Sequence, residues 1–578
     1  CKDLLALSND GNSYDLTETA TPTDLHFSTD STAIFTLNYP HAAKFIINAQ
    51  KDVEVEDTDG NKLIKDFSVS SNAFVERPFG IKLDFSNDTN SSNALAQDAD
   101  GSSFKKAGES FTLTATAMQW VSGQDETGAG SVPDGIPDDF VVFNQNTLTA
   151  ENFTGGEISI NNVLLLPNPG NNPVLNIIES NSFNANNSSL DNKYSFDEVG
   201  IIELKSTLAS NDYLGAGDIL GAVTNVGRFT PAYFTQTVES HGSLTASCDL
   251  IINNWAYAGQ TRELAGLSVG AISYKDLLAP IIRITAYNLS DVITQNYTES
   301  GFMKLLKTGI DITEPVADNE TLRLEPIVTG EKIMLSSVMN RGEEPVLTTT
   351  KGVVSYTFNE SDDFVYEHTK HSEIKPFPAK IPFLVTRVED GDKINLYAGS
   401  NTDITATQKV ITSGVEIRFG RWYAENAFGP ETSSLPTPMY VQYLKETGFE
   451  INKDDNCTVP DIEDEINSGL IWSGGLSAWE YRLLDASTDI NEPITPENTS
   501  ATAPDPLISF SDGEYREFIF SPPGAGNIGS LELEYQVPPW LQYDWNNDES
   551  FTNNPTSTLT FGIYRGNDRI IYQREISR

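Results

Sequence analysis

The stretch FTLTATAM, residues 111–118, decides the fold class of this chain. Its apolar residues Phe111, Leu113, Ala115 and Ala117 alternate with three threonines. Successive side chains of a β-strand point to opposite faces of its sheet, so this period of two is typical of a half-buried antiparallel strand.

The same alternation occurs in other parts of the chain. LELEYQV, residues 531–537, alternates apolar residues with glutamates and a glutamine, and IIRITAY, residues 281–287, repeats the pattern. Turn signals such as DTDGN, DADGS and VEDGDK lie between such stretches, whereas long helical periodicity is nearly absent. The sequence therefore predicts an all-β protein of tandem immunoglobulin-like antiparallel β-sandwich domains with very little helix.

The length of 578 residues is too great for one core, and composition changes indicate where domains meet. FVERPFG, ending at residue 80, resembles the exit strand of a first domain, TQTVESHGS opens a third, and an acidic run after residue 452 precedes the last. We predict β-sandwich domains at 1–88 (lacking an N-terminal part), 89–236 (with an acidic loop), 237–452 (with an insertion) and 453–578.

The charge balance limits the partners of the chain. It has 37 Lys and Arg against 82 Asp and Glu, a net charge of −45. Such a surface repels nucleic acid and anionic lipid and attracts divalent cations, although acidic residues are often simply solvated. Because of this charge we expect no nucleic-acid partner. There is no apolar run of 18 residues, so we also expect no membrane span.

The three cysteines, Cys1, Cys248 and Cys457, are too few for a disulfide scaffold. We expect a Cys248–Cys457 bridge if the protein is secreted, and two buried thiols otherwise. The chain begins at Cys1 rather than Met, which suggests a processed or truncated product, and a lipid-modified Cys1 is an alternative.

Two motifs of enzymes occur without their structural context. GAGNIG, residues 524–529, matches a nucleotide-binding fingerprint, but the following LELEYQV is a predicted strand where that site needs a helix. GLSVG, residues 266–270, matches a nucleophile elbow, but its surroundings are all-β. His368 and His371 would lie on opposite faces of a strand, as a solvated pair rather than a zinc site. We therefore predict a non-catalytic protein.

Two acidic loops are candidate calcium sites, because Ca²⁺ takes six to eight oxygen ligands and short side chains at alternate positions can converge on it. The loop YDWNNDESF differs from an EF-hand, with Glu549 in place of glycine and Pro555 in place of the bidentate glutamate. The alternative for this loop is a hydrogen-bonded turn between strands. The candidate ligands are Asp544, Asn546, Asp548 and Ser550 in this loop, and Asp125, Asp134 and Asp138 in DETGAGSVPDGIPDD.

An aromatic cluster, Trp540, Tyr543 and Trp545, lies beside the last acidic loop. Exposed rings of this kind stack on sugars, and we predict ligand binding here. The alternative is that these residues pack in the core or fix the loop.

Several longer stretches resemble the C-terminal region of MshQ-type proteins, which are associated with the mannose-sensitive haemagglutinin (MSHA) type IV pilus. They are RFGRWYAENAFGPETSSLPTPMYVQYL (418–444), DDNCT (454–458), FSPPGAGNIGS (520–530) and NNPTSTLTFGIYRGNDRIIYQREISR (553–578). FVERPFGIKL and WAYAGQ extend the resemblance upstream, to about residue 70. The resemblance implies an extracellular, β-rich, pilus-associated surface protein. Asn546 and Glu549 depart from the more EF-like loop of that family.

These observations lead to one leading expectation and two alternatives. We expect a non-catalytic, adhesin-like protein of the cell surface or pilus, whose sandwiches form a stalk or display platform with calcium-binding loops. The expected partners are pilus or cell-surface proteins, with glycans as a further candidate. The alternatives are a self-assembling subunit of an extracellular fibre or sheath, joined by open strand edges, and, ranked last, a secreted glycan-active enzyme.

Overall fold

The computed structural model describes most of the chain. The described residues are 4–9, 29–30, 32, 39–125, 133–154, 156–184, 188–246, 254–264, 267–313, 335–338, 346–397, 409–458, 481–487, 499, 501–502 and 509–562.

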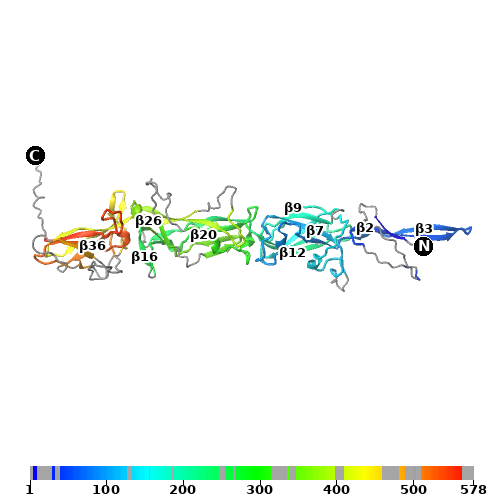
Figure 1. Cartoon of the computed structure of the whole chain (residues 1–578), viewed down its shortest axis with the longest axis horizontal. Coiled ribbons are helices and arrows are strands. Elements are labelled where there is room, and N and C mark those ends of the chain that lie inside the picture. The colour runs from blue at the N-terminus through cyan, green and yellow to red at the C-terminus, as the bar shows by residue number, and fades with distance from the viewer. Residues whose placement is uncertain are drawn as a thin grey trace, which may run out of the picture.

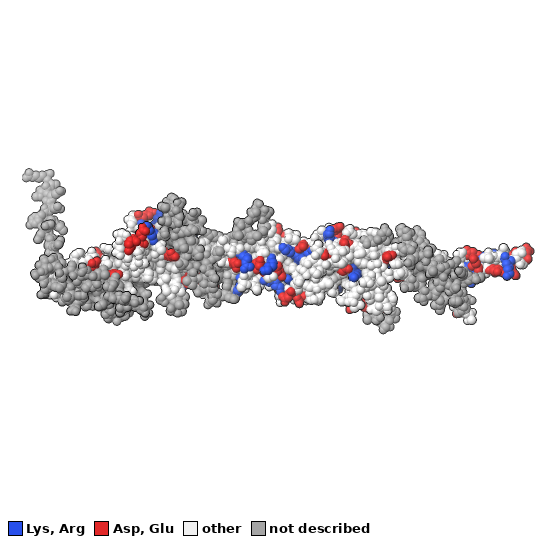
Figure 2. Space-filling model, in the orientation of Figure 1, with Lys and Arg blue, Asp and Glu red and all other residues white. Residues whose placement is uncertain are grey.

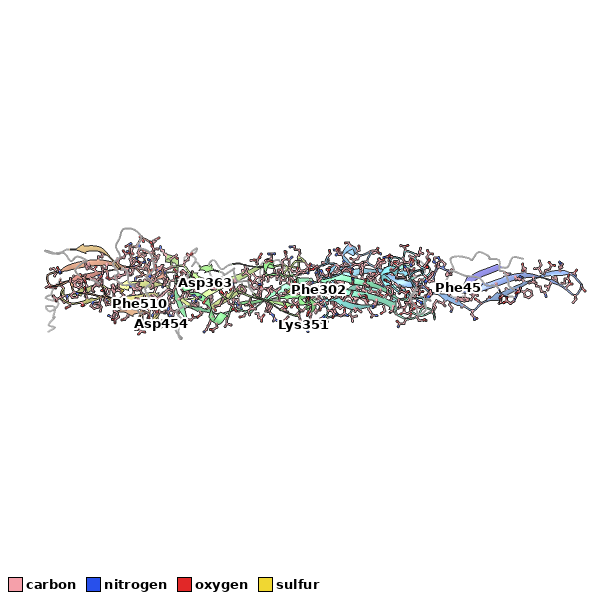
Figure 3. All side chains as sticks on the ribbon, turned by 90° about the horizontal axis from the view of Figure 1, so that it is seen from below. Phe45, Phe302, Lys351, Asp363, Asp454 and Phe510 are labelled. Carbon is pink, nitrogen blue, oxygen red and sulfur yellow. The ribbon has the colours of Figure 1, made fainter. Side chains whose placement is uncertain are left out.

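The molecule is a row of β-sheet units along one long axis. In Figure 1 the sheets follow one another from the β2–β3 region to β36. Figure 3 shows the same order, because Phe45, Phe302, Asp363 and Phe510 succeed one another along the axis. The described residues form three large hydrophobic clusters and two small ones. The chain therefore folds as tandem immunoglobulin-like β-sandwiches with separate cores, as the alternating pattern predicts.

The first unit is a single described sheet that contains β1 (Leu4–Asn9), β2 (Ala43–Glu56), β3 (Lys62–Ser70) and β4 (Phe74–Glu76). β2 is central and pairs antiparallel with the other three strands. All nine residues of β3, the outermost strand, are exposed. The small core of the first unit contains Ala43 and Phe45.

The second unit is a sandwich of two four-stranded sheets. One contains β5 (Gly80–Asp84), β7 (Ser110–Met118), β10 (Ser189–Ser195) and β9 (Asn176–Glu179). The other contains β6 (Lys105–Lys106), β12 (Gly221–Thr230), β11 (Gly200–Leu208) and β8 (Ile158–Leu166). Phe111, Leu113, Ala115 and Ala117 of β7 are all buried in the shared core, so the predicted alternation is confirmed.

The third unit has three four-stranded sheets around one core. They contain β13 (Tyr233–Ser240), β19 (Ile281–Tyr287), β23 (Val353–Thr357) and β22 (Val346–Thr350); β14 (Leu244–Ala246), β18 (Ile272–Tyr274), β24 (Asp363–Tyr366) and β21 (Leu335–Val338); and β15 (Trp255–Tyr257), β26 (Lys409–Arg418), β25 (Phe377–Val388) and β20 (Ile310–Thr313). A separate hairpin pairs β16 (Thr261–Leu264) with β17 (Leu267–Gly270). Ser268 therefore lies on a strand and not on the strand-to-helix turn that a nucleophile elbow requires.

The fourth unit also has three sheets around one core. They contain β27 (Gly420–Ala424), β30 (Met439–Lys445), β31 (Gly448–Ile451) and β34 (Glu514–Tyr515); β28 (Ala427–Gly429), β37 (Thr556–Phe561), β36 (Gly529–Tyr535) and β32 (Tyr481–Ser487); and β29 (Leu435–Pro436), β35 (Ile519–Phe520) and β33 (Ala501–Thr502). A strand, β36, follows the glycine-rich loop as predicted, and Leu531, Leu533 and Tyr535 point into the core.

Sheet membership shows where the chain passes from one core to the next. β5 pairs within the second unit, β13 within the third, and β27 to β31 within the fourth. The sequence places the domain boundaries at residues 88, 236 and 452. The strand β5 ends before residue 88, β13 spans residue 236, and β27 to β31 end before residue 452.

Helix is scarce in the described residues. The single α-helix, α1 (Phe140–Phe143), begins after Asp139, whose carboxylate accepts hydrogen bonds from the first helical N–H groups. Among the residues described, no helix has the length and apolar character to cross a bilayer. On the face shown in Figure 2, acidic and basic side chains lie interspersed.

Candidate functional site

Strand alternation in the fourth unit produces a row of aromatic side chains on the outer side of β27 and β30. The two strands are antiparallel, with Arg421 opposite Gln442 and Tyr423 opposite Tyr440. The intervening Trp422 and Val441 are fully buried in the core. Because neighbours along a strand point to opposite faces, Arg421, Tyr423 and Tyr440 must point outward. We call Arg421, Tyr423, Tyr440, Phe449, Tyr543 and Trp545 the aromatic face.

Arg421 lies among the rings of the aromatic face. Its guanidinium carbon is 3.7 Å from the ring centroid of Phe449 and 5.1 Å from those of Tyr543 and Trp545. Its Nε donates a hydrogen bond of 3.0 Å to Gln442. Burial lowers the pKa of Arg421 from its ordinary value. Cation–π contacts of this kind fix a charged group in place, and here they hold the rings in one arrangement.

The open end of the aromatic face consists of tyrosine and tryptophan rings. Tyr423 is 37% exposed, and its ring lies 6.3 Å from that of Tyr440 and 6.4 Å from that of Trp545, centroid to centroid. The Tyr440 hydroxyl donates to Glu425 across 3.1 Å and accepts from Arg516 across 3.3 Å. Burial and the neighbouring Glu425 raise the pKa of Tyr440. Aromatic stacking surface and polar groups therefore lie side by side at the surface.

The aromatic face includes two of the three predicted ligand-binding residues. Tyr543 and Trp545 belong to it, with ring centroids 5.2 Å apart. Trp540 does not, because its side chain packs against the core of the fourth unit. The other four members, Arg421, Tyr423, Tyr440 and Phe449, were not predicted. RFGRWYAENAF contains a signal for the first two, since Arg421 and Tyr423 alternate with the apolar Trp422 and Ala424.

Tyr543 also connects the aromatic face to the third unit. Its hydroxyl donates a 2.6 Å hydrogen bond to Glu373, and burial together with that carboxylate raises the pKa of Tyr543 to about 12. Nearby, Lys370 pairs with Glu549 across 2.7 Å and Lys375 with Glu446 across 3.0 Å. The loop of the fourth unit that contains the predicted calcium ligands Asp544 to Ser550 thus lies against the third unit.

His368 is half-buried at this contact, which corrects the expectation of a solvated histidine pair. Its ring stacks on Phe419 with centroids 4.4 Å apart and planes 4° apart. Its Nε2 donates to the backbone carbonyl of Gln542 across 2.8 Å. Burial lowers the pKa of His368, so the neutral ring is favoured. The segment after β24 turns this residue inward because the fourth unit covers it.

The other side of the same contact is formed by strand β15. Ala256 and Ala258 pack in the third core, whereas Trp255 and Tyr257 pack in the fourth. The guanidinium of Arg418 lies 4.8 Å from the centroid of a Trp255 ring. A Cβ on Gly420 would lie 2.5 Å from the Tyr257 ring, so only glycine fits there.

Arg418 is fixed by polar partners from the fourth unit. It pairs with Asp454 across 2.8 Å, and its Nη1 donates to Asn452 across 2.6 Å. Figure 3 shows Asp454 between Phe510 and Asp363 along the long axis. One strand therefore contributes side chains to two cores, and a buried polar contact joins the same two units.

The contact between the second and third units is built in the same way. The buried carboxylate of Glu198 accepts hydrogen bonds from the backbone N–H groups of Gln295 and Asn296, at 3.0 and 3.2 Å. Arg228 forms a bidentate pair with Asp392, with one N–O distance of 2.7 Å. Bidentate pairs of this kind fix orientation as well as distance.

The first predicted calcium loop is closed by hydrogen bonds to its own backbone. Asp544 accepts from the N–H groups of Asp548 at 2.8 Å and Glu549 at 3.1 Å, and Asp548 accepts from Ser550 at 2.9 Å. Asn546 is exposed. The arrangement matches the alternative of a hydrogen-bonded turn, in which the carboxylates already have donors.

The second predicted calcium loop has the same character. The buried Asp125 accepts from the N–H groups of Asp134 at 2.8 Å and Gly135 at 2.9 Å. Asp138 donates its own N–H to the carbonyl of Gln124. Residues 126–132 lie outside the described residues. Within the ranges that the structure describes, no three His, Cys, Asp or Glu side chains gather to hold a metal ion. Calcium binding stays a prediction.

Cys457 is disulfide-bonded. The expected partner, Cys248, lies outside the described residues, and so does Cys1. The pairing Cys248–Cys457 therefore stays a prediction. Cys457 packs against the fourth core, where its N–H donates to Asp455 across 3.1 Å.

Comparison with known proteins identifies the family. Models described as DUF6701, second domain, third domain and fourth domain match residues 77–194, 198–411 and 418–576. No curated protein matches the chain. Among solved structures, the chain is similar to the I-band fragment I67-I69 from titin and to an E-to-A mutated variant of titin domains I67-I69. Each is 7% identical, covers 79% of this chain and 93% of that chain, and has a TM-score of 0.17, which carries no argument. Because three consecutive domains of one family account for nearly all of residues 77–576, the chain belongs to the DUF6701 family.

Proposed function

We propose that this chain is an extracellular, non-catalytic, adhesin-like display rod whose contact surface is the aromatic face. The observation that carries the proposal is the row of Tyr440, Tyr423 and Trp545 rings on the open side of the fourth unit. Tyrosine, tryptophan and arginine dominate binding energy at protein surfaces, because they offer large, stiff, amphipathic contact areas.

The chemistry of the aromatic face favours a sugar as its ligand. The apolar face of a sugar ring stacks on an aromatic ring, and its hydroxyls need donors and acceptors at the edge. Gln442, Glu425 and Arg516 supply such groups beside the rings. Glu425 already accepts from Tyr440, and Glu514 from Arg516 at 3.0 Å, which suits a positioning role better than acid–base catalysis.

The joints support the role of a display rod. A stiff row of sandwiches holds its last unit far from its first, so that a terminal face can reach a surface (Figure 1). Stiffness requires that units do not swivel, and the shared β15 strand and the bidentate Arg228–Asp392 pair both oppose swivelling.

Three observations support an extracellular location. Cys457 is disulfide-bonded, and structural disulfides are typical of oxidising compartments. The net charge of −45 keeps a surface protein soluble. The resemblance to MshQ-type proteins adds association with a type IV pilus and with cell-surface proteins as the finer part of the proposal.

A glycan array probed with the full chain tests the proposal. We expect selective binding that falls about tenfold or more in Tyr423→Ala and Trp545→Ala, since hot-spot residues contribute above about 1 kcal/mol each. The matched control is Phe428→Ala, which removes a ring that is 70% exposed but lies on β28 outside the aromatic face. Equal binding by all four proteins, or by none, would remove the sugar-binding role.

One observation favours self-assembly as a second function. Ile64, Phe67 and Val69 of the outermost strand β3 are 74%, 56% and 67% exposed. A long edge strand with open apolar side chains can pair with another chain. Sedimentation of the full chain against Phe67→Lys tests this role, and a monomer at every concentration would remove it.

A further inference from the structure

The second unit contains a buried lysine–aspartate pair. Lys105 on β6 places its Nζ 3.1 Å from Oδ1 of Asp88, in the loop that follows β5. The two side chains are 7% and 3% exposed. Lys105 is the only lysine that is buried among those whose side chains the structure describes. An isolated charge buried to this degree is unstable unless it is paired, so the contact is built into the fold.

Aromatic rings form the surroundings of the pair. Nζ of Lys105 lies 5.6 Å from the ring centroid of Phe104, which packs on Phe85 and Phe111 with centroids 5.5 and 5.7 Å away. All three rings are buried. Two charged groups within an apolar shell of this kind have lost most of their contact with water, and that desolvation is costly.

Two backbone N–H groups and a second carboxylate complete the arrangement. The N–H of Asn90 donates to Oδ1 of Asp88 and that of Thr112 to Oδ2, each at 2.8 Å. Glu109 lies with Oε1 3.8 Å from Nζ of Lys105, and its side chain is 42% exposed. Lys105 also lies within 3.4 Å of the Thr89 hydroxyl. The groups that an acyl transfer needs are therefore together. Lys105 is the nucleophile, Asp88 is the electrophile, the backbone N–H groups are donors for a developing oxyanion, and the partly exposed Glu109 can carry a proton.

We propose that Lys105 and Asp88 condense to an intramolecular isopeptide bond. Glu109 takes one proton from the Lys105 ammonium, and the freed lone pair of Nζ attacks Cγ of Asp88. The N–H group that donates to the oxygen that stays on Cγ, Asn90 on Oδ1 or Thr112 on Oδ2, stabilises the tetrahedral oxyanion. The C–N bond forms, one C–O bond breaks, and the departing oxygen leaves as water with two of the three ammonium protons. An ammonium and a carboxylate become a neutral amide and water, so that no oxidant or other co-reactant is needed.

Two physical effects favour this condensation at this place. The fold holds the reacting groups in contact, which corresponds to a very high effective concentration. The product replaces two buried charges by one neutral amide, which removes their desolvation cost, and the N–H group on the retained oxygen still donates to the amide carbonyl.

The bond would join the two sheets of the second unit. β5 pairs with β7 in one sheet, and β6 pairs with β12 in the other. A covalent link between them restricts the unfolded chain and opposes separation of the sheets under tension. Such a link suits a rod that is under tension when its end is attached to a surface.

Mass spectrometry of the full chain after reduction tests the proposal. Trypsin cleaves after Lys82 and Lys106, and an acylated Lys105 resists cleavage. We expect a peptide of residues 83–106 that is lighter by one water than its sequence, without backbone fragments between 88 and 105. A peptide of full mass, or cleavage after Lys105, would overturn the proposal.

Two controls separate the isopeptide bond from other losses of water. Asp100–Gly101 lies in the same peptide and can lose water as a succinimide, which hydroxylamine opens and an isopeptide bond survives. Lys105→Arg keeps the charge but cannot condense, so its peptide should have full mass; loss of water in that variant would contradict the proposal. Glu109→Gln should slow formation, and complete cross-linking at the earliest time would exclude Glu109 as proton carrier.

Discussion

The hydroxyl of Tyr257, in the third unit, donates a 2.8 Å hydrogen bond to Oδ2 of Asp455, in the fourth, and both side chains are fully buried. Asn452 donates to the same hydroxyl across 2.7 Å. Asp455 also accepts from the N–H and the hydroxyl of Thr458, at 2.8 and 2.6 Å. Burial and the charge of Asp455 raise the pKa of Tyr257, so the phenol keeps its proton and its role as donor. One phenol and one carboxylate therefore tie the two units together.

Tyr257→Phe should loosen this joint. The variant leaves Asp455 without one donor and Asn452 without its acceptor, and an unsatisfied buried group costs about 1–3 kcal/mol. We expect the free energy of unfolding of the last two units to fall by that amount in urea titrations. Tyr423→Phe, at an exposed ring, is the matched control and should change it by less than about 0.5 kcal/mol. Equal effects of the two variants would contradict the role of Tyr257.

His368 should make the same joint sensitive to acid. Burial lowers its pKa in the folded protein below the ordinary 6.5, whereas the unfolded chain keeps the ordinary value. Below about pH 6.5 the unfolded state therefore binds more protons, and folding stability falls as pH falls, by up to about 1.4 kcal/mol per pH unit. The loss ends once pH drops below the folded pKa.

His368→Phe keeps the stacking on Phe419 and removes the titrating group. Carboxylates titrate in both proteins, so the difference in free energy of unfolding between wild type and variant isolates His368. We expect wild type to lose stability relative to His368→Phe between pH 7 and pH 5. His241→Phe, at an exposed histidine, is the control for the loss of a histidine as such. A flat difference for His368→Phe would show that His368 does not titrate differently on folding.

The fold could be predicted because strand alternation is a local property. Phe111 and Leu531 each lie in a stretch where every second residue is apolar, and both stretches are strands with those residues buried. The passage from one core to the next is harder to predict. Trp255 and Ala256 are adjacent, yet they pack in different units. The sequence of a strand does not say which core each of its faces meets.

The candidate site could be predicted only in part, for a similar reason. Trp540 and Trp545 are close in sequence and equally aromatic, but the first packs on the core and the second lies on the aromatic face. The rings that complete the face, Tyr423, Tyr440 and Phe449, come from β27, β30 and β31. Only the pairing of these strands brings them beside Trp545. Inspection of one loop at a time cannot find a surface that is built from four segments.

Arg421→Met should loosen the aromatic face from within. The variant keeps a long apolar side chain but loses the hydrogen bond to Gln442 and the cation–π contacts with Phe449, Tyr543 and Trp545. We expect a loss of about 1–3 kcal/mol in the free energy of unfolding, and weaker ligand binding because the rings are less fixed. Differential scanning calorimetry measures the first effect.

Arg516→Met is the control for Arg421. This arginine is exposed, pairs with Glu514 across 3.0 Å and lies 5.7 Å from the Tyr440 ring centroid. Exposed pairs contribute about 0–1 kcal/mol, so its stability should change little. A larger loss in Arg516→Met than in Arg421→Met would mean that the half-buried guanidinium of Arg421 does not organise the face.

Asp544→Ala separates the two interpretations of the last acidic loop. Asp544 accepts two backbone hydrogen bonds, so its removal should destabilise the fourth unit by about 1–2 kcal/mol in the presence of a chelator, whatever the loop binds. If calcium also binds there, calcium raises the melting temperature of wild type by mass action, and Asp544→Ala loses most of that rise. Asp57→Ala is the matched control, because Asp57 closes a similar turn, accepting from Asp59 at 2.9 Å and Asn61 at 2.8 Å, outside both predicted calcium loops. It should keep the full response to calcium. No response in wild type would exclude calcium from both loops, whereas a response that survives Asp544→Ala would place the ion elsewhere, with the Asp125 loop tested next by Asp125→Ala.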